Sequence, residues 1–356
     1  AASGLCPPLP WWMLLLFMSS LSFAAAGKLL VMPMDGSHWL SMRVVLNELR
    51  KRGHEIIVVA PEINLFIGAS ESYMMKTYPV PFTKEELDGH FLTFAEINFK
   101  EQPFPLRIIK IFENVKNTSA LLLAACTHLL YNRELMGYIE GSNFDAVFTD
   151  PMMPCGQIIA LHLSIPSIFF LRGIPCGVDS EAAQCPNPPS YVPRMLSSNT
   201  DRMTFTQRVK NLLISSSESL LCDIAYSQFE SLASDFLQRP MTMKELLSHG
   251  SIWLKRVDFV FEYPMPVMPN MVFIGGINCG QKKPLSQVSD LFALYHLVWG
   301  CSIIHDPSSL HLASPCANWP HVPLLPFAPF DSVGGTRLAH PTTANTASHT
   351  MWIGSF

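Results

Sequence analysis

Charged residues are scarce in this chain of 356 amino acids, since Asp, Glu, Lys and Arg make up 15% of it, where about 25% is usual for a globular protein. The net charge of -4 lacks the basic excess of a nucleic-acid-binding protein. Nine cysteines are too few for a scaffold built on disulfides. Glycine is not enriched, at 19 residues beside 29 prolines, which excludes collagen and flexible-linker compositions. Because 49% of the residues are hydrophobic, most of the chain is expected to fold around a core.

Several short enzyme motifs are absent as well. The sequence has no Gly-x-Gly-x-x-Gly and no Walker A motif, and it lacks the Gly-x-Ser-x-Gly elbow of α/β-hydrolases. It also has no Cys-x-x-Cys pair and no His-Glu-x-x-His, so the cysteine spacings match no metal motif. We therefore expect no metal site, and either buried thiols or one disulfide among Cys126, Cys155, Cys176, Cys185, Cys222 and Cys279.

An apolar run at residues 11–26 ends in small residues just before Gly27. It is shorter than the roughly 20 residues that span a bilayer, and it finishes in an Ala-x-Ala pattern. The run therefore predicts a secretory signal peptide over residues 1–26. A membrane anchor is the alternative, because no Lys or Arg precedes the run. Secretory entry would allow disulfides and would make Asn117, in the sequon Asn117-Thr118-Ser119, a glycosylation site.

The mature chain begins with a strand, a helix and a second strand. Residues 28–32 form an apolar run, residues 38–52 carry apolar side chains at helical spacing, and residues 55–60 form a β-branched run. Such a βαβ unit implies parallel strands joined by a right-handed crossover. Buried parallel strands have continuous apolar sequences, as these do.

The alternation continues along the chain. We predict further strands at 145–149, 167–171, 258–263 and 271–276, and further helices at 154–163, 204–223 and 226–237. The pattern predicts an α/β fold, a Rossmann-like doubly wound parallel sheet, over residues 27–287. The apolar stretch 119–130 fits a buried helix better than a peripheral membrane contact.

The composition changes near the end. Residues 288–356 contain only four charged residues but seven prolines, which would interrupt regular elements. We expect this tail to be poorly ordered and to have no function of its own.

Two polar residues follow predicted strands, at the edge where open α/β sheets bind ligands. His38 comes after Gly36, which permits a tight turn, and Ser37, a plausible N-cap. The helix dipole favours a neutral ring there, able to accept a proton; the alternative is a surface histidine. Asp150 follows the strand at 145–149, and it could orient such a histidine and stabilise its imidazolium. The alternative for Asp150 is an Asp-Pro turn.

Six segments together resemble the N-terminal half of family 1 UDP-glucuronosyltransferases, over about Leu14 to Gln287. They are GKLLVMPMDGSHWLSM, RGHEIIVVAPE, FDAVFTDPMMPCG, AAQCPNPPSYVPR, MTFTQRVKNLL and EYPMPVMPNMVFIGGINC. The resemblance implies the GT-B fold, in which two Rossmann-like domains face each other across a cleft. The first of these domains would bind a lipophilic acceptor and the second UDP-glucuronic acid.

The same resemblance implies an inverting, metal-free transfer of glucuronic acid to an acceptor hydroxyl. His38 would be the general base, and Asp150 would orient it. It also implies the lumen of the endoplasmic reticulum, association with the membrane, and possible pairing with other family members.

The sequence departs from the family after Gln287. The sugar-nucleotide signature and the C-terminal transmembrane helix of the family do not follow. We therefore expect this chain to be inactive by itself. The alternative function is a non-catalytic form that binds the acceptor or modulates a full-length enzyme.

Overall fold

The computed structural model describes residues 26–280, except 101–102, 175, 196 and 261. The chain divides into two compact units, Ala1–Asn278 with Asn345–Phe356, and Cys279–Ala344. All but the last two described residues belong to the first unit. The predictions of a signal peptide over 1–26 and of a disordered tail over 288–356 lie outside the described residues, apart from Ala26.

The described residues form one parallel sheet of seven strands in the order β3-β2-β1-β4-β5-β6-β7. The order changes direction at β1, whose neighbours are β2 and β4, as in other doubly wound folds. The strands are β1 (Lys28–Met32), β2 (Glu55–Pro61), β3 (Met74–Tyr78), β4 (Ala146–Thr149), β5 (Ser167–Leu171), β6 (Gly250–Lys255) and β7 (Met271–Phe273).

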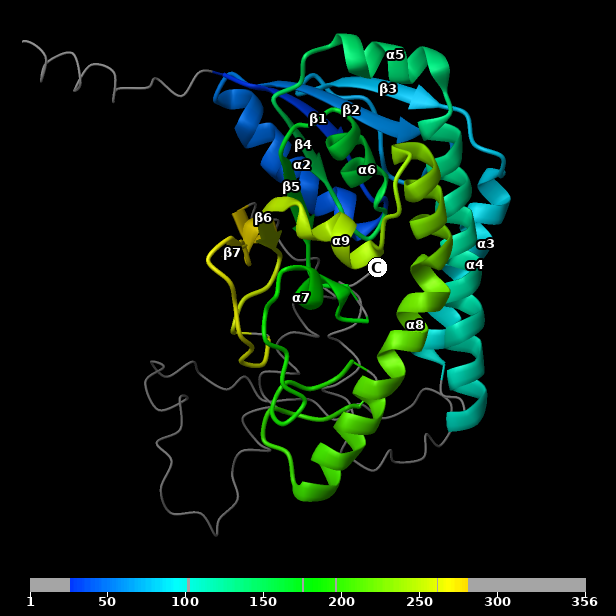
Figure 1. Cartoon of the computed structure of the whole chain (residues 1–356), viewed down its shortest axis with the longest axis vertical. Helices are drawn as coiled ribbons and strands as arrows, with labels where there is room; N and C mark the ends of the chain where they lie inside the picture. The colour runs from blue at the N-terminus through cyan, green and yellow to red at the C-terminus, as the bar shows by residue number, and fades with distance from the viewer. Residues whose placement is uncertain (1–25, 101–102, 175, 196, 261, 281–356) are drawn as a thin grey trace, which may run out of the picture. The chain divides into compact units, whose positions relative to one another are not determined.

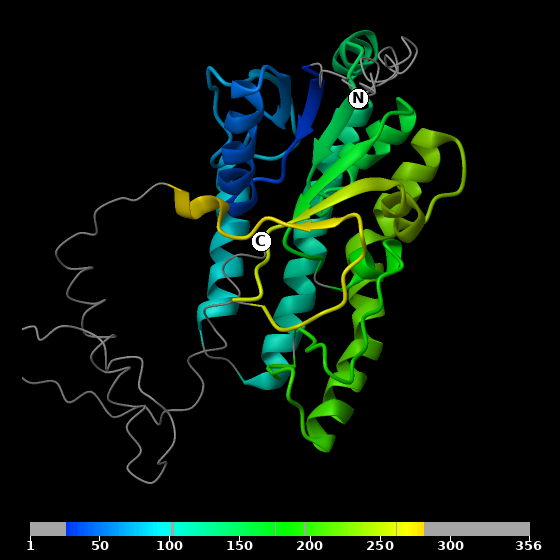
Figure 2. The ribbon, with the colours of Figure 1, turned by 90° about the vertical axis from the view of Figure 1, so that its left-hand side faces the viewer.

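Helices cover both faces of this sheet (Figures 1 and 2). They are α2 (Ser37–Lys51), α3 (Lys84–Phe99), α4 (Phe104–Leu130), α5 (Arg133–Gly141), α6 (Cys155–His162), α7 (Val178–Ala182), α8 (Phe205–Leu237) and α9 (Met243–Ser248), followed by the short 3-10 helix η1 (Ile277–Gly280).

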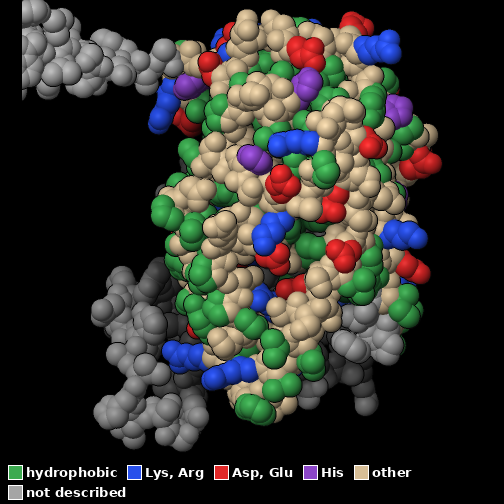
Figure 3. Space-filling model, in the orientation of Figure 1, with side chains coloured by type: hydrophobic (Ala, Val, Ile, Leu, Met, Phe, Trp, Pro, Cys, Tyr) green, Lys and Arg blue, Asp and Glu red, His purple; other side chains and the backbone are tan. Residues whose placement is uncertain are grey.

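Side chains of β1 alternate between two separate apolar cores. Leu29 and Val31 pack with Trp39 and Leu46 of α2 on one face. Leu30 and other side chains of the opposite face pack with α4, α5, α6, α8 and α9. The predicted doubly wound α/β fold is therefore confirmed. Over the face shown in Figure 3, acidic and basic side chains are interspersed, which agrees with the small net charge.

Two of the predictions for individual helices and strands are wrong. The helices expected at 204–223 and 226–237 are one helix, α8, which runs through a serine-rich stretch. Ser216 and Ser217 lie inside the helix and donate hydrogen bonds to the carbonyls of Leu212 and Leu213, one turn earlier. The helix also continues through residues 224 and 225, where the prediction left a gap.

The strand expected at 258–263 is also wrong. The Asp258 carboxylate accepts a hydrogen bond from the Val260 N–H at 2.9 Å, which makes a turn, and Val260 is 81% exposed. The strand that precedes β7 is β6, at Gly250–Lys255. Within the described ranges, no helix combines the length and apolarity needed to cross a bilayer.

Candidate active site

His38 lies in the first turn of α2, directly after the tight turn that follows β1. Gly36 has φ 76° and is the N-cap of this helix, so the expectation that Ser37 is the cap is wrong: Ser37 is the first helical residue. A glycine suits this position because other residues adopt a positive φ only at a cost. The turn places the His38 side chain inside the protein, with 0% of its surface exposed, so the alternative of a surface histidine is excluded.

Asp150 follows β4, the strand that pairs with β1. Its backbone N–H donates to the Met32 carbonyl at 3.3 Å, which extends the β1–β4 ladder by one residue. Its Oδ1 accepts a hydrogen bond from the Met152 N–H at 3.0 Å. The side chain is fully buried. Because β1 and β4 are parallel neighbours, their carboxyl ends bring these two loops together.

The two predicted residues meet. His38 Nδ1 lies 2.5 Å from Asp150 Oδ2, across a sequence separation of 112 residues. A carboxylate oxygen accepts hydrogen bonds, so this contact favours the ring tautomer with its proton on Nδ1. His38 Nε2 is then the basic atom, and it has no hydrogen-bond partner among the described residues. Such a pair can take a proton at Nε2 while Asp150 stabilises the imidazolium that results.

A half-buried arginine that the sequence did not reveal lies beside the pair. Arg256 follows β6, and its Nη1 donates to Ser41 Oγ of α2 at 2.9 Å, while its guanidinium lies over the Phe170 ring. Burial lowers the pKa of Arg256, and the negative charge of Asp150 opposes that shift. The cation therefore offsets part of the negative charge that burial of Asp150 brings into the core. Because β6 was not predicted, no signal placed Arg256 at this sheet edge.

An apolar pocket lies against the same strand ends. It has about 890 Å³ of space between its walls, part of it open to solvent. Met34 lies between β1 and His38, and Met153 follows Asp150 by three residues. The other walls are the segment after β2, including Ile63 and Ile67, together with Phe82, one face of α3, and one face of α4. An apolar pocket beside a buried acid–base pair is a common arrangement for binding a small organic molecule.

A sequence model of the family described as UDP-glucoronosyl and UDP-glucosyl transferase matches residues 27–294. The chain belongs to this family. It is 53% identical to rat (Rattus norvegicus) UDP-glucuronosyltransferase 1A1 over 274 residues, which are 77% of this chain and 51% of that protein. It is 53% identical to human (Homo sapiens) UDP-glucuronosyltransferase 1A1 over 262 residues, which are 74% of this chain and 49% of that protein. The chain thus spans about half the length of these relatives.

Among solved structures, the calicheamicin glycosyltransferase CalG4 matches 70% of this chain and 53% of its own, with a TM-score of 0.41 and 14% identity. The family resemblance predicted from the six sequence segments is therefore confirmed by the family match and the two curated relatives.

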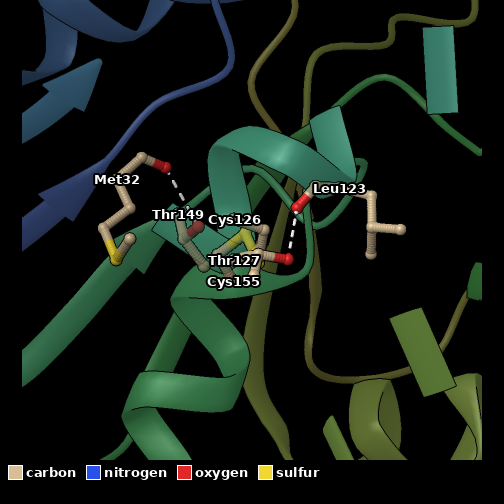
Figure 4. Close-up of a disulfide and its surroundings, with 6 residues drawn as sticks. All are labelled: Met32, Leu123, Cys126, Thr127, Thr149 and Cys155. Carbon is tan, nitrogen blue, oxygen red and sulfur yellow. Dashed lines mark hydrogen bonds between the residues drawn. A yellow bond between two sulfur atoms is a disulfide. The ribbon is translucent and has the colours of Figure 1, made fainter. Parts of the chain in front are cut away.

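The described residues of this chain form two disulfides, so the expectation of buried thiols or one disulfide is wrong. Cys126 of α4 is bonded to Cys155, the first residue of α6 (Figure 4). Cys176 is bonded to Cys222 of α8. Sequence spacing missed them because both bridges join segments that only the fold brings together. Cys185 is a buried free thiol and Cys279 an exposed one.

Asn117 lies on the exposed side of α4. The third residue of its sequon, Ser119, donates a hydrogen bond to the Ala225 carbonyl of α8. Glycosylation of Asn117 stays a prediction. In the described part of the chain, no three His, Cys, Asp or Glu side chains gather as metal ligands.

Proposed function

We propose that this chain supplies the acceptor site and the catalytic base of a UDP-glucuronosyltransferase, which transfers glucuronic acid from UDP-glucuronate to a hydroxyl of a lipophilic acceptor. The observation that carries the proposal is the buried His38–Asp150 pair, whose Nε2 has no hydrogen-bond partner among the described residues, at strand ends that also line an apolar pocket.

In this reaction His38 Nε2 removes the proton of the acceptor hydroxyl as that oxygen attacks the anomeric carbon of the sugar. The bond between the anomeric carbon and the phosphate oxygen breaks, and its electron pair leaves with UDP. Attack from the face opposite UDP inverts the anomeric centre. Throughout the reaction the Asp150 carboxylate accepts a hydrogen bond from His38 Nδ1–H. This bond holds the ring in place and stabilises the imidazolium. No step requires a metal ion.

Two observations support the choice of substrates. The curated relatives named above are UDP-glucuronosyltransferases, which favours UDP-glucuronate as the donor. The pocket walls are dominated by Phe, Leu, Ile and Met side chains, which favour an apolar acceptor by burying its surface away from water.

The proposal places the protein in the lumen of the endoplasmic reticulum, with association at the membrane. Disulfides form and persist in oxidising compartments, and the described residues form two of them. The predicted signal peptide and the exposed Asn117 agree with that compartment. Pairing with full-length family members remains a prediction.

The decisive experiment places residues 27–280 into rat UDP-glucuronosyltransferase 1A1 in exchange for the matching half, and measures glucuronide formation from UDP-glucuronate and a phenol. We expect turnover by the chimera and a loss of about 100- to 10,000-fold with His38→Ala, the usual range for a general base. Unchanged turnover in the variant would overturn the role of His38.

A second measurement addresses the chain itself. Calorimetric titration of residues 27–356 with UDP-glucuronate, and separately with the phenol, tests donor and acceptor binding. The proposal expects saturable binding of the phenol. Absence of phenol binding to both the chain and the chimera would exclude the acceptor site.

A further inference from the structure

Four polar side chains line the otherwise apolar pocket: Asp35, His90 of α3, and Asn114 and Thr118 of α4. Asp35 is fully engaged, because its carboxylate accepts hydrogen bonds from the backbone N–H groups of Gly36, Leu65 and Phe66 at 2.7, 2.6 and 3.2 Å. Asn114 and Thr118 line the pocket from α4. Both are half-buried, and within the described ranges neither side chain has a hydrogen-bond partner.

These two side chains share one face of α4. Asn114 and Thr118 are four residues apart, which places them one turn apart on the same side of a helix. Leu121, Leu122 and Ala125 continue that face along the pocket wall. The amide of Asn114 and the hydroxyl of Thr118 can each donate and accept, so together they suit a carbonyl or a hydroxyl of a bound molecule.

The position of this pair along α4 separates it from the reacting end. The Cys126–Cys155 disulfide attaches the far end of the pocket-lining face to α6, next to the turn that carries Asp150. Thr118 lies eight residues before Cys126, or about 12 Å along the helix at 1.5 Å per residue. Only apolar side chains line α4 between them in the pocket.

We propose, resting on the proposed function, that Asn114 and Thr118 select acceptors that carry a second polar group about 10 Å from the reacting hydroxyl, with an apolar ring system between the two. A molecule with one ring is too short to reach both ends. The selected class is therefore phenols with two or more rings and a hydrogen-bonding group at the far end.

The test uses a matched pair of para-hydroxybiphenyls, one with an acetyl group at the far para position and the other with an ethyl group there. Both bury the same rings, and they differ in one carbonyl oxygen. Their dissociation constants are measured by calorimetry on residues 27–356, produced without N-glycosylation. We expect the native chain to bind the acetyl compound about 3- to 10-fold more tightly, which is the range for one neutral hydrogen bond.

Three variants and a matched control identify the residues that produce the preference for the acetyl compound. Asn114→Leu and Thr118→Val are expected to bring the ratio of the two dissociation constants to about one, while Thr118→Ser, which keeps a hydroxyl, retains a preference. Asn117→Leu makes the same replacement on the exposed side of α4 and is expected to leave the ratio unchanged.

The outcomes separate this proposal from the proposed function. If both compounds bind but the native chain shows no preference, or if the preference survives in Asn114→Leu and Thr118→Val, the polar pair is not the selector. A preference that survives in these variants would mean that another polar residue of the pocket wall, such as His90 of α3, binds the carbonyl group. If neither compound binds to any variant or to the native chain, the acceptor site itself is wrong, and both proposals fail.

Discussion

Cys126 and Cys155 join the helix that walls the apolar pocket to the helix that follows the Asp150 turn, with their Cα atoms 5.6 Å apart. Asp150 lies five residues before Cys155, and Met153, between them, lines the pocket. In the same region Thr149 Oγ1 donates to the Met32 carbonyl at 2.9 Å (Figure 4). One covalent bond therefore fixes the pocket wall and the candidate catalytic turn relative to each other.

Replacing both cysteines of this bridge with serine is expected to lower the free energy of unfolding by about 3 kcal/mol, because the bond closes a loop of 29 residues in the unfolded chain. Urea titration of the oxidised protein measures the change. Cys279→Ser, at an exposed free thiol, is the control and is expected to have no effect. Equal stability of the double variant and the native chain would show that the bridge does not constrain the unfolded state.

Asp150→Asn keeps the size of the side chain but removes its negative charge. The neutral amide no longer stabilises the imidazolium of His38, and its NH2 can donate to Nδ1 and so favour the other ring tautomer. Turnover of the chimera is therefore expected to fall by about 100- to 10,000-fold. Steady-state kinetics check this, with the change expected in kcat more than in the acceptor KM.

The matched control for that variant is Asp145→Asn, at the opposite end of the same strand, where the carboxylate accepts a hydrogen bond from the Lys28 N–H at 2.6 Å. It is expected to leave kcat unchanged. Equal losses in the two variants would mean that the Asp150 effect is structural and not catalytic.

The first βαβ unit was predictable almost to the residue, because its strands are continuous apolar runs and its helix has a regular apolar face. His38 and Asp150 were predictable as candidates for the same reason, since each follows a strand that the pattern identifies. Their meeting depends on β1 and β4 being neighbours, which local pattern does not reveal.

Other features depend on contacts that the sequence pattern does not display. Strand β6 has the sequence GSIWLK, with only three consecutive apolar residues, and its identity comes from pairing with β5 and β7. Arg256 reaches the candidate site only because β6 ends there. The continuity of α8 across residues 224 and 225 was also not predicted; there the Ala225 carbonyl accepts a hydrogen bond from Ser119 of α4, a contact between helices that local pattern does not display.

Gly156→Ala is expected to destabilise the protein by about 1 to 3 kcal/mol, the usual cost of overpacking. Gly156 lies in the first turn of α6, and a Cβ there would overlap Thr149, whose side chain is held by its bond to Met32. Gly137→Ala is the matched control, because a Cβ in that helical position meets nothing within 4 Å. Alanine there is expected to stabilise α5 by about 0.5 to 1 kcal/mol. Thermal unfolding measures both changes, and equal shifts would contradict the packing argument.

The half-buried Glu218 of α8 is expected to make the folded protein less stable as the pH rises. Burial raises its pKa from 4.5 to about 7, although Arg194, whose Nε lies 3.5 Å from Glu218 Oε2, opposes the shift. The folded state therefore holds this proton more tightly than the unfolded state does. The resulting stabilisation is complete below about pH 4.5 and is lost as the pH rises through about 7.

Between about pH 5 and pH 8, the free energy of unfolding is expected to fall by about 2 to 3 kcal/mol more in the native chain than in Glu218→Gln. Urea titrations across that range measure the difference, and parallel pH profiles for the two proteins would show that Glu218 ionises as freely in the folded state as in the unfolded one.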